Sequence, residues 1–141
     1  MPTRKATATW EGTIKGGKGT FRGETGLGGA YSFASRFENG PGSNPEELLA
    51  AAEAACFSMA LSLGLEKAGT PPTKIDTEAA CTIDKVGEGF KITKIRLSVR
   101  ANVPKIAEEK FQEIARATKE GCPVSMALRS VEIELDARLI Q

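Results

Sequence analysis

The chemistry open to this sequence is thiol chemistry, because the chain contains three cysteines and no histidine. Without an imidazole, Ser-His-Asp and Cys-His arrangements and every histidine-ligated metal site are excluded. Hydroxyls need a base and lysines need desolvation, so the cysteines are the main nucleophile candidates at neutral pH. Three cysteines are too few for a disulfide scaffold, and their spacing matches neither a zinc motif nor a CxxC redox motif.

Local context ranks the three cysteines. Cys81 alternates with the apolar residues of a predicted strand and is expected to fill core space. Cys56 lies in the middle of an apolar segment, where burial raises the pKa of a thiol and lowers its reactivity. Cys122 follows Gly121 and precedes Pro123, so it can stand at the N-cap of a short helix, whose free amides and dipole favour a thiolate. Context alone therefore favours Cys122 as the thiolate.

Two charged residues, Arg36 and Glu46, lie ahead of Cys56 and could support a thiolate. Their simplest interpretations are a solvated strand end for Arg36 and helix-dipole complementarity for Glu46. Glu46 lies ten residues before Cys56, which along a helix is about 15 Å, so the two cannot share a site within one chain. If they cooperate, Glu46 must reach the thiol of a second subunit. Two copies of this small-residue helix packed antiparallel at a two-fold axis would achieve that.

A long helix should position Cys56. Asn44 has the composition of an N-cap, Pro45 suits the first helical position, and Glu47 is the capping-box carboxylate. Residues 48–65 are apolar nearly all round, so we expect this helix to be central and covered on most sides. Its alanine-rich composition and Glu53 near its middle argue against a membrane span.

Strands are expected before and after this helix along the sequence. Those before it are predicted over residues 6–14, 20–22 and 31–37, and glycine-rich hairpin turns connect them. A hairpin over residues 75–83 and 95–101 follows, then an amphipathic helix opened by Pro104 and closed by Gly121, and a final strand near residues 131–138. This order indicates an α+β fold with mainly antiparallel sheet, in one domain over residues 1–141.

Composition restricts the partners and the compartment. The chain has 19 Lys and Arg against 18 Asp and Glu, a net charge of +1, which removes the electrostatic case for nucleic acid or an anionic membrane surface. The first residues show no apolar signal region and no cleavage-like site, so we expect a reducing, cytoplasmic location. A disulfide there is more often transient and catalytic than structural.

Two motifs resemble the OsmC/Ohr family of organic hydroperoxide reductases. One is the run from Asn44 to Ser62 around Cys56, and the other is Gly121 to Ser125 around Cys122. Shorter matches extend the resemblance over essentially the whole chain: Trp10-Glu11-Gly12, Gly17-Lys18-Gly19 and Arg36-Phe37-Glu38. The run that begins Cys56-Phe57-Ser58, together with an arginine at position 36, is more similar to the OsmC branch than to the Ohr branch.

The resemblance implies an OsmC-like fold, in which antiparallel sheets surround a long central apolar helix in an intertwined homodimer. It makes Cys56 the peroxidatic cysteine and Cys122 the resolving cysteine, against the ranking by context, and we follow the resemblance. Arg36 and Glu46 match the arginine and glutamate that complete the site across the dimer, in agreement with the helix spacing.

The sequence departs from the family pattern at two places. Glu53 stands where some relatives have a histidine. The Ohr branch carries its arginine in the early glycine loop, where Arg22 or Lys18 could take the place of Arg36.

By this resemblance the chain is expected to be a peroxidase of oxidative and osmotic stress defence. The Cys56 thiolate would attack an organic hydroperoxide and release an alcohol, and Cys122 would convert the resulting sulfenic acid into a Cys56–Cys122 disulfide. An external dithiol or a lipoyl-bearing protein would reduce that disulfide, with no metal or other cofactor. Apolar helix faces around Cys56 suit fatty or aromatic peroxides better than hydrogen peroxide. The alternative is a non-catalytic dimeric stress or ligand-binding protein with inert thiols, or a redox sensor that does not turn over.

Overall fold

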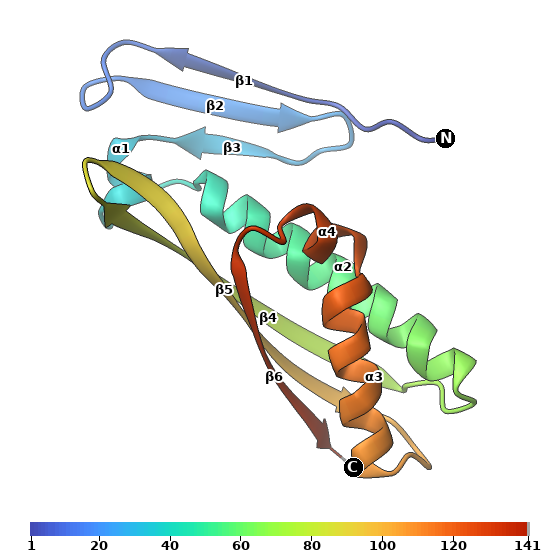
Figure 1. Ribbon diagram of the computed structural model, residues 1–141. Helices are drawn as coiled ribbons and strands as arrows, with labels where there is room; N and C mark the ends of the chain where they lie inside the picture. The colour runs from blue at the N-terminus through green and yellow to red at the C-terminus, as the bar shows by residue number, and fades with distance from the viewer. Residues whose placement is uncertain (141) are drawn as a thin grey trace. The chain divides into compact units, whose positions relative to one another are not determined.

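The computed structural model describes residues 1–140, which form an α+β fold of two units, Met1–Leu48 and Leu49 onward (Figure 1). The first unit contains β1 (Ala6–Glu11), β2 (Lys18–Gly23), β3 (Gly28–Tyr31) and α1 (Phe33–Phe37). Helix α2 (Pro45–Lys67) begins in the first unit and continues into the second. The second unit adds β4 (Lys74–Val86), β5 (Gly89–Asn102), α3 (Glu108–Gly121), α4 (Pro123–Ala127) and β6 (Glu132–Ile140). The predicted α+β class is confirmed, and one domain over the whole chain stays a prediction.

The first unit is an antiparallel meander in the order β1-β2-β3. Aromatic rings hold its strands together, with the centroid of Tyr31 5.5 Å from that of Trp10 and 6.0 Å from that of Phe21. A Cβ at Gly19 would lie 2.5 Å from the Tyr31 ring and 2.7 Å from the Trp10 ring. Glycine at position 19 therefore allows the two rings to close over β2.

The strand predicted over residues 31–37 is wrong beyond Tyr31, because Phe33–Phe37 form helix α1. Ser32 is the N-cap of this helix, and its hydroxyl accepts a hydrogen bond from the Ser35 amide at 3.0 Å. The Ser35 hydroxyl in turn accepts from the Ser32 amide at 2.8 Å. In a strand, these two amides would need hydrogen-bond acceptors on a neighbouring strand. The reciprocal capping box supplies acceptors for both within the helix start.

Helix α2 begins where the sequence predicts. The Asn44 side chain accepts a hydrogen bond from the Glu47 amide at 2.8 Å, as an N-cap does. The Glu47 carboxylate does not complete the capping box, because it accepts a hydrogen bond from the Ser43 hydroxyl instead. After Lys67 the chain turns at Gly69, whose φ of 83° suits glycine and ends the helix.

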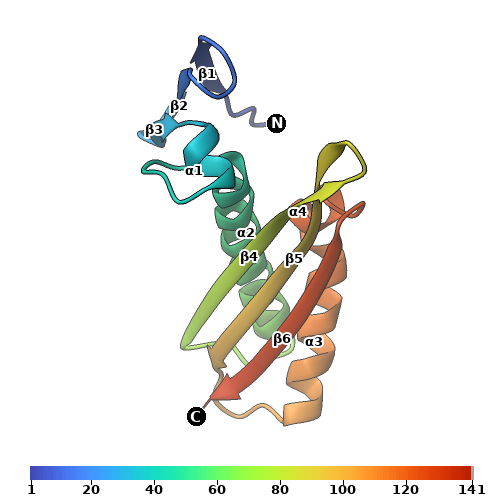
Figure 2. The same ribbon diagram turned by 90° about the vertical axis from the view of Figure 1, so that its left-hand side faces the viewer.

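The second unit has the sheet order β4-β5-β6. Strands β4 and β5 form the predicted antiparallel hairpin, but β6 lies parallel to β5. The connection from β5 to β6 runs through α3 and α4, and such a long helical crossover returns the chain in the same direction. Helices α2 and α3 lie on one face of this sheet, as Figure 2 shows.

Helix α3 begins at Glu108 rather than at Pro104. Lys105 has a φ of 67°, which is outside helical geometry, so the chain turns before the helix can start. Its amphipathic character is as predicted, because Phe111 and Ala115 on one face are fully buried, whereas Glu109 and Glu113 are exposed. The helix ends at Gly121, as the sequence predicts.

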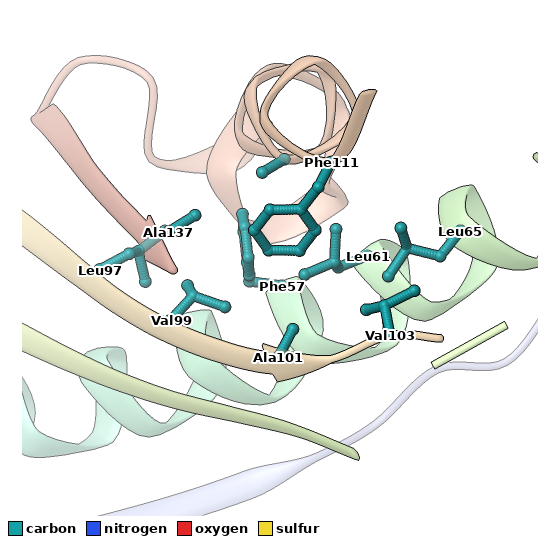
Figure 3. Close-up of a cluster of buried hydrophobic side chains, with 10 residues drawn as sticks. Phe57, Leu61, Leu65, Leu97, Val99, Ala101, Val103, Phe111 and Ala137 are labelled. Carbon is teal, nitrogen blue, oxygen red and sulfur yellow. The ribbon is translucent and has the colours of Figure 1, made fainter. Parts of the chain in front are cut away.

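The hydrophobic core of the second unit lies between the sheet and the two helices (Figure 3). Its fully or nearly fully buried members come from α2, β5 and the residue after it, α3 and β6: Phe57, Leu61, Leu65, Leu97, Val99, Ala101, Val103, Phe111, Ala115 and Ala137. These contacts fix the part of α2 that carries Cys56 against the sheet.

One stripe of α2 is buried, contrary to the expectation that the helix is covered on most sides. Phe57, Leu61 and Leu65 are fully buried, whereas Met59 is 77% exposed and Leu63 is 51% exposed. Pro45–Lys67 is long and apolar enough to cross a membrane by length and composition, with a mean hydropathy of 1.8 in its most apolar window. Its buried stripe packs on the sheet of its own chain.

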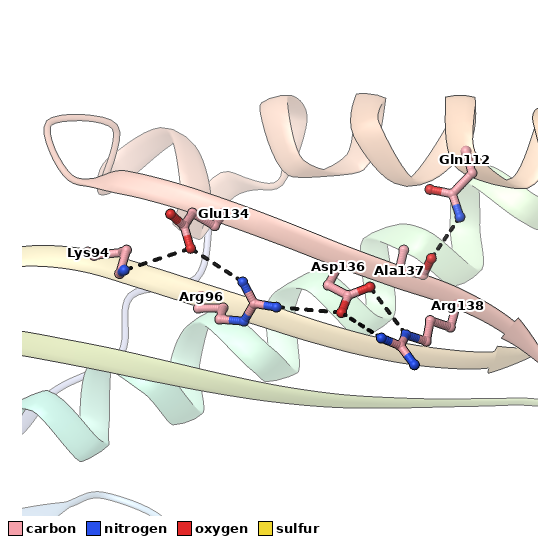
Figure 4. Close-up of polar contacts among 7 residues, drawn as sticks. All are labelled: Lys94, Arg96, Gln112, Glu134, Asp136, Ala137 and Arg138. Atoms are coloured by element: carbon pink, nitrogen blue, oxygen red, sulfur yellow. Dashed lines mark hydrogen bonds and ion pairs between the residues drawn. The ribbon is translucent and has the colours of Figure 1, made fainter.

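Charged side chains cover the outer face of β5 and β6 (Figure 4). Arg96 lies 3.4 Å from Glu134 and 3.5 Å from Asp136, so one guanidinium pairs with two carboxylates of the neighbouring strand. Exposed pairs of this kind each contribute little to stability. On the helix side, the Gln112 side chain donates to the Ala137 carbonyl at 2.7 Å and attaches α3 to β6.

We expect Leu97→Ala to lower the free energy of unfolding by about 2–5 kcal/mol, because it leaves a cavity in a fully buried position. Urea unfolding followed by circular dichroism measures the change. Val86→Ala is the control, since Val86 lies in the same hairpin and is 51% exposed. Equal losses in the two variants would contradict the placement of the core.

Candidate functional site

The structure brings Cys56 and Cys122 together. Cys56 lies on α2 and Cys122 lies between α3 and α4, with 66 residues of chain between them and 2.8 Å between their sulfur atoms. Both are thiols, because this separation exceeds the disulfide bond length of about 2.05 Å. Cys122 is 0% exposed, whereas Cys56 is only partly buried. A reagent from solvent therefore reaches Cys56 first, with Cys122 in contact behind it.

The amide predicted to favour a thiolate at Cys122 contacts Cys56 instead. Cys122 stands at the N-cap of α4 as expected, but its side chain makes no capping hydrogen bond. The backbone N–H of Val124, in the first turn of α4, donates to the Cys56 sulfur. The helix amide thus binds a sulfur from a distant part of the chain, a contact that the local context of each cysteine does not reveal.

The surroundings of Cys56 raise the pKa of its thiol. Burial contributes most, followed by the contact with Cys122, and the charge of Glu53 adds to the effect. The hydrogen bond from the Val124 amide lowers the pKa but does not offset the other causes. The thiolate of Cys56 consequently needs further positive charge to form at neutral pH.

Glu53 and Ser125 form a buried pair next to the two thiols, and the sequence did not predict it. Glu53 is 0% exposed and Ser125 is 3% exposed. The Ser125 hydroxyl donates to both carboxylate oxygens, at 3.1 Å for Oε2. The sequence feature that could have indicated this pair is its spacing from the cysteines: Glu53 lies three residues before Cys56, and Ser125 lies three residues after Cys122. Positions three apart share a helix face.

Arg36 and Glu46 form a bidentate ion pair in the first unit. The Arg36 Nε donates to Glu46 Oε1 at 3.0 Å, and its Nη2 donates to Oε2 at 2.9 Å. The guanidinium side chain is 35% exposed and the carboxylate side chain 7%. Within residues 1–140, the remaining nitrogen, Nη1, bonds no acceptor. Such a pair has a fixed orientation and keeps donors for an incoming group.

Local hydrogen bonds explain why these two residues meet. The Ser35 hydroxyl donates to the Ser43 carbonyl at 2.7 Å, and the Asn44 side chain donates to the Ser35 carbonyl at 3.0 Å. These bonds attach α1, which carries Arg36, to the start of α2, which carries Glu46. The predicted site residues therefore occur as two pairs, Arg36–Glu46 in the first unit and Cys56–Cys122 in the second.

The alternative cations, Lys18 and Arg22, lie on β2 and form no ion pair in the part of the chain that the structure describes. Cys81 lies on β4 opposite Ile95 of β5, on the half-buried side of the strand that its alternation predicts, but it is only partly buried and is not one of the residues of the hydrophobic core. Among the described residues, no three His, Cys, Asp or Glu side chains are grouped so that they could hold a metal ion.

Comparisons with known proteins show which family the chain is similar to. A family model described as OsmC-like protein matches residues 38–136. The chain is 52% identical to the peroxiredoxin OsmC of Escherichia coli (strain K12) over 138 residues, which cover 96% of each protein. It is 34% identical to the organic hydroperoxide resistance protein OhrB of Bacillus subtilis (strain 168), over 72% of this chain and 74% of that protein.

A solved structure is similar over nearly the whole chain. It is the crystal structure of an organic hydroperoxide resistance protein from Elizabethkingia anophelis, with a TM-score of 0.76 and 28% identity. The match covers 99% of this chain and 98% of that one.

We expect Cys122→Ala to lower the pKa of Cys56, because it removes the sulfur contact and the charge that help to raise it. A lower pKa means more thiolate at neutral pH, so the alkylation of Cys56 by iodoacetamide should become faster. Peptide mass mapping across a pH series gives the rate for each cysteine separately. Cys81→Ala should leave the Cys56 profile unchanged, and an unchanged or higher pKa in Cys122→Ala would refute this account of the thiol.

Proposed function

This chain belongs to the family of OsmC-like proteins, and we propose on that basis that it is a thiol peroxidase that reduces organic hydroperoxides to alcohols. The observation that carries the proposal is the contact between a partly exposed thiol, Cys56, and a fully buried one, Cys122, at 2.8 Å. This arrangement suits a cysteine that is oxidised by a substrate and a second that closes the disulfide. The names of the relatives, a peroxiredoxin and hydroperoxide resistance proteins, support the same activity.

In the first step the Cys56 thiolate attacks the outer oxygen of the hydroperoxide ROOH. The S–O bond forms as the O–O bond breaks, the alkoxide leaves as the alcohol after taking a proton, and Cys56 becomes a sulfenic acid. The leaving oxygen gains negative charge in this step. Arg36 is the proposed cation that holds the thiolate and offsets that charge, and Glu46 orients its guanidinium through the bidentate contact.

In the second step Cys122 attacks the sulfur of the Cys56 sulfenic acid and forms the Cys56–Cys122 disulfide, with loss of water. The sulfur atoms are already in contact, so the step needs only a small approach. A dithiol, free or carried as a lipoyl group on another protein, then reduces the disulfide by exchange and restores both thiols.

The guanidinium is proposed to come from a second copy of the chain. Glu46 and Cys56 lie on one uninterrupted helix, so ten residues separate them by about 15 Å along its axis. Since Arg36 is paired with Glu46, the same distance along the helix limits its access to Cys56 of its own chain. A homodimer in which each subunit supplies Arg36 and Glu46 to the thiol of its partner removes the difficulty.

The exposed stripe of α2 supports such a dimer. Ala52, Ala55, Met59 and Leu63 are exposed and follow one another along the helix at spacings of three and four residues. A stripe of small and apolar residues lets two helices approach closely and removes apolar surface from water. Ala55 of this stripe directly precedes Cys56, so the thiol would lie near the interface, in apolar surroundings that favour fatty or aromatic peroxides.

We expect one equivalent of an alkyl hydroperoxide to convert the reduced protein into the Cys56–Cys122 disulfide, as followed by peptide mass mapping. Cys81 should remain a thiol. Repeated turnover with a dithiol distinguishes a peroxidase from a redox sensor that reacts once. Persistence of both thiols after peroxide treatment would refute the proposed function.

We expect Arg36→Ala to slow the formation of the Cys56 sulfenic acid by about 100-fold, because the loss of one charge-stabilising donor costs that much in comparable sites. Arg36→Lys keeps the charge but loses the bidentate contact, so its rate should lie between those of the wild type and Arg36→Ala. Arg22→Ala is the matched control on β2. A slow Arg22→Ala and a normal Arg36→Ala would assign the cation to β2 instead.

We expect Met59→Glu to convert the dimer into a monomer, because it places a charge in the centre of the exposed apolar stripe. Light scattering coupled to size-exclusion chromatography measures the mass, and the peroxidase rate should fall with it. Val86→Glu, at an exposed position of the β4–β5 hairpin, is the control and should leave the mass unchanged. A monomeric wild-type protein with full activity would rule out the shared site.

A further inference from the structure

The buried carboxyl of Glu53 takes no part in the steps described above, although it lies close to the thiols along the chain. Glu53 precedes Cys56 by three residues on α2, and Ser125 follows Cys122 by three residues on α4. The hydrogen bond from the Ser125 hydroxyl to the Glu53 carboxylate therefore runs beside the sulfur contact. The two contacts are successive links between α2 and the segment that carries Cys122.

Filling the core does not explain this carboxyl. A buried carboxylate is unfavourable unless polar groups bind it, and an apolar side chain would fill the space without that cost. Among residues 1–140, Glu53 has no ion pair, and Ser125 is its only side-chain hydrogen-bond donor. Its neighbours on the same helix face, Phe57 and Leu61, are apolar and equally buried. We therefore attribute the presence of a carboxylate at position 53 to its hydrogen bond with Ser125.

Helix α4 has few other attachments. It contains five residues, and Ser125 is its only buried one, while Pro123, Met126 and Ala127 are exposed. Val124 is half-buried, so apolar packing of α4 rests mainly on one side chain. The hydrogen bonds that reach it from α2 are those of Ser125 with Glu53 and of the Val124 amide with Cys56.

We propose that Glu53 and Ser125 are positioning residues for disulfide formation, because their hydrogen bond holds α4, and with it Cys122, against Cys56. This role rests on the proposed function, since it concerns the resolving step. In that step the Cys122 sulfur bonds to the Cys56 sulfur, and the S–O bond of the sulfenic acid breaks. The Cys122 thiol proton leaves with the hydroxide as water, so the Cys56 sulfur is reduced and the Cys122 sulfur is oxidised.

The hydrogen bond and the charge of Glu53 have separable effects. Ser125→Ala removes the donor and keeps the charge, so it tests the position of Cys122. Glu53→Gln keeps an acceptor for Ser125 and removes the charge, so it tests the ionisation of Cys56. The groups that face the Cys56 thiol in this unit are the Glu53 carboxylate, the Cys122 thiol and the Val124 amide, and the last two remain in both variants.

The first test follows both steps after one equivalent of an alkyl hydroperoxide. Trapping with dimedone measures the sulfenic acid at Cys56, and peptide mass mapping measures the disulfide. We expect Ser125→Ala to slow disulfide closure by about tenfold or more, the factor that a lost hydrogen bond to a charged group supplies. Sulfenic acid should accumulate in this variant, and Ser125→Thr, which keeps the hydroxyl, should restore fast closure.

Ser58→Ala is the matched control. Ser58 also lies on α2, and its hydroxyl donates to another element, at 2.7 Å to Thr77 of β4; the hydrogen bonds of this hydroxyl lie within α2 and to β4. Its loss should leave the rate of closure unchanged. Equal slowing in Ser58→Ala and Ser125→Ala would mean a general loss of structure and would overturn the positioning role.

The second test uses no peroxide. We expect the alkylation profile of Cys56 in Glu53→Gln to shift to lower pH, because one of the causes that raise the pKa of Cys56 is removed. A purely structural carboxyl would not produce this shift, so an unchanged profile overturns the effect of its charge. Disulfide closure in Glu53→Gln should remain close to the wild-type rate, because the acceptor for Ser125 is kept.

Diamide, a general thiol oxidant, separates this proposal from the proposed function. If the wild type forms no disulfide with peroxide but forms it with diamide, the peroxidase proposal fails, and slow closure of Ser125→Ala with diamide still supports the positioning role. If the wild type reacts with peroxide and Ser125→Ala closes its disulfide as fast, the positioning role is overturned and the proposed function stands.

Discussion

The contact between two thiols in a site without histidine is the constraint on which the rest of this structure depends. At 2.8 Å, the sulfur atoms of Cys56 and Cys122 are close enough to react once one of them is oxidised. The burial that makes this contact possible also raises the pKa of Cys56 and works against its thiolate. The fold must therefore hold the sulfurs together and supply positive charge from elsewhere.

We propose that the two units divide these tasks. The second unit places the thiols: the core under α2 fixes Cys56, and the crossover through α3 and α4 returns Cys122 to it. The first unit holds Arg36 and Glu46 in a bidentate pair, attached to the start of α2 by hydrogen bonds of Ser35 and Asn44. Because ten residues of helix separate Glu46 from Cys56, we propose that the pair serves the thiol of a second chain, which would bind the exposed apolar stripe of α2.

Local interactions made much of the fold predictable. The start of α2 follows from Asn44 and Pro45, and the alternation of apolar residues identifies β4, β5 and β6, because capping and burial act within a few residues. The family motifs pointed to Arg36, Glu46, Cys56 and Cys122 as site residues. Helix α1 was missed because its capping box has serine at the position where glutamate or glutamine gives the usual signal.

Contacts between distant segments were not predictable in the same way. Alternation does not say that β6 lies parallel to β5, which depends on the length of the crossover. An amide at the start of α4 was correctly expected near the cysteines, but its acceptor is Cys56, on another helix. The hydrogen bond between Glu53 and Ser125 joins residues 72 positions apart, and only their spacing from the two cysteines hinted at it.

The most direct test of the shared site mixes two inactive chains. One carries Cys56→Ala and keeps Arg36, and the other carries Arg36→Ala and keeps Cys56. If Arg36 of one subunit serves Cys56 of the other, each mixed dimer contains one complete site, and random mixing restores about a quarter of the wild-type peroxidase activity. If the mixture is no more active than the two variants measured separately, Arg36 does not act across subunits and the central claim is contradicted.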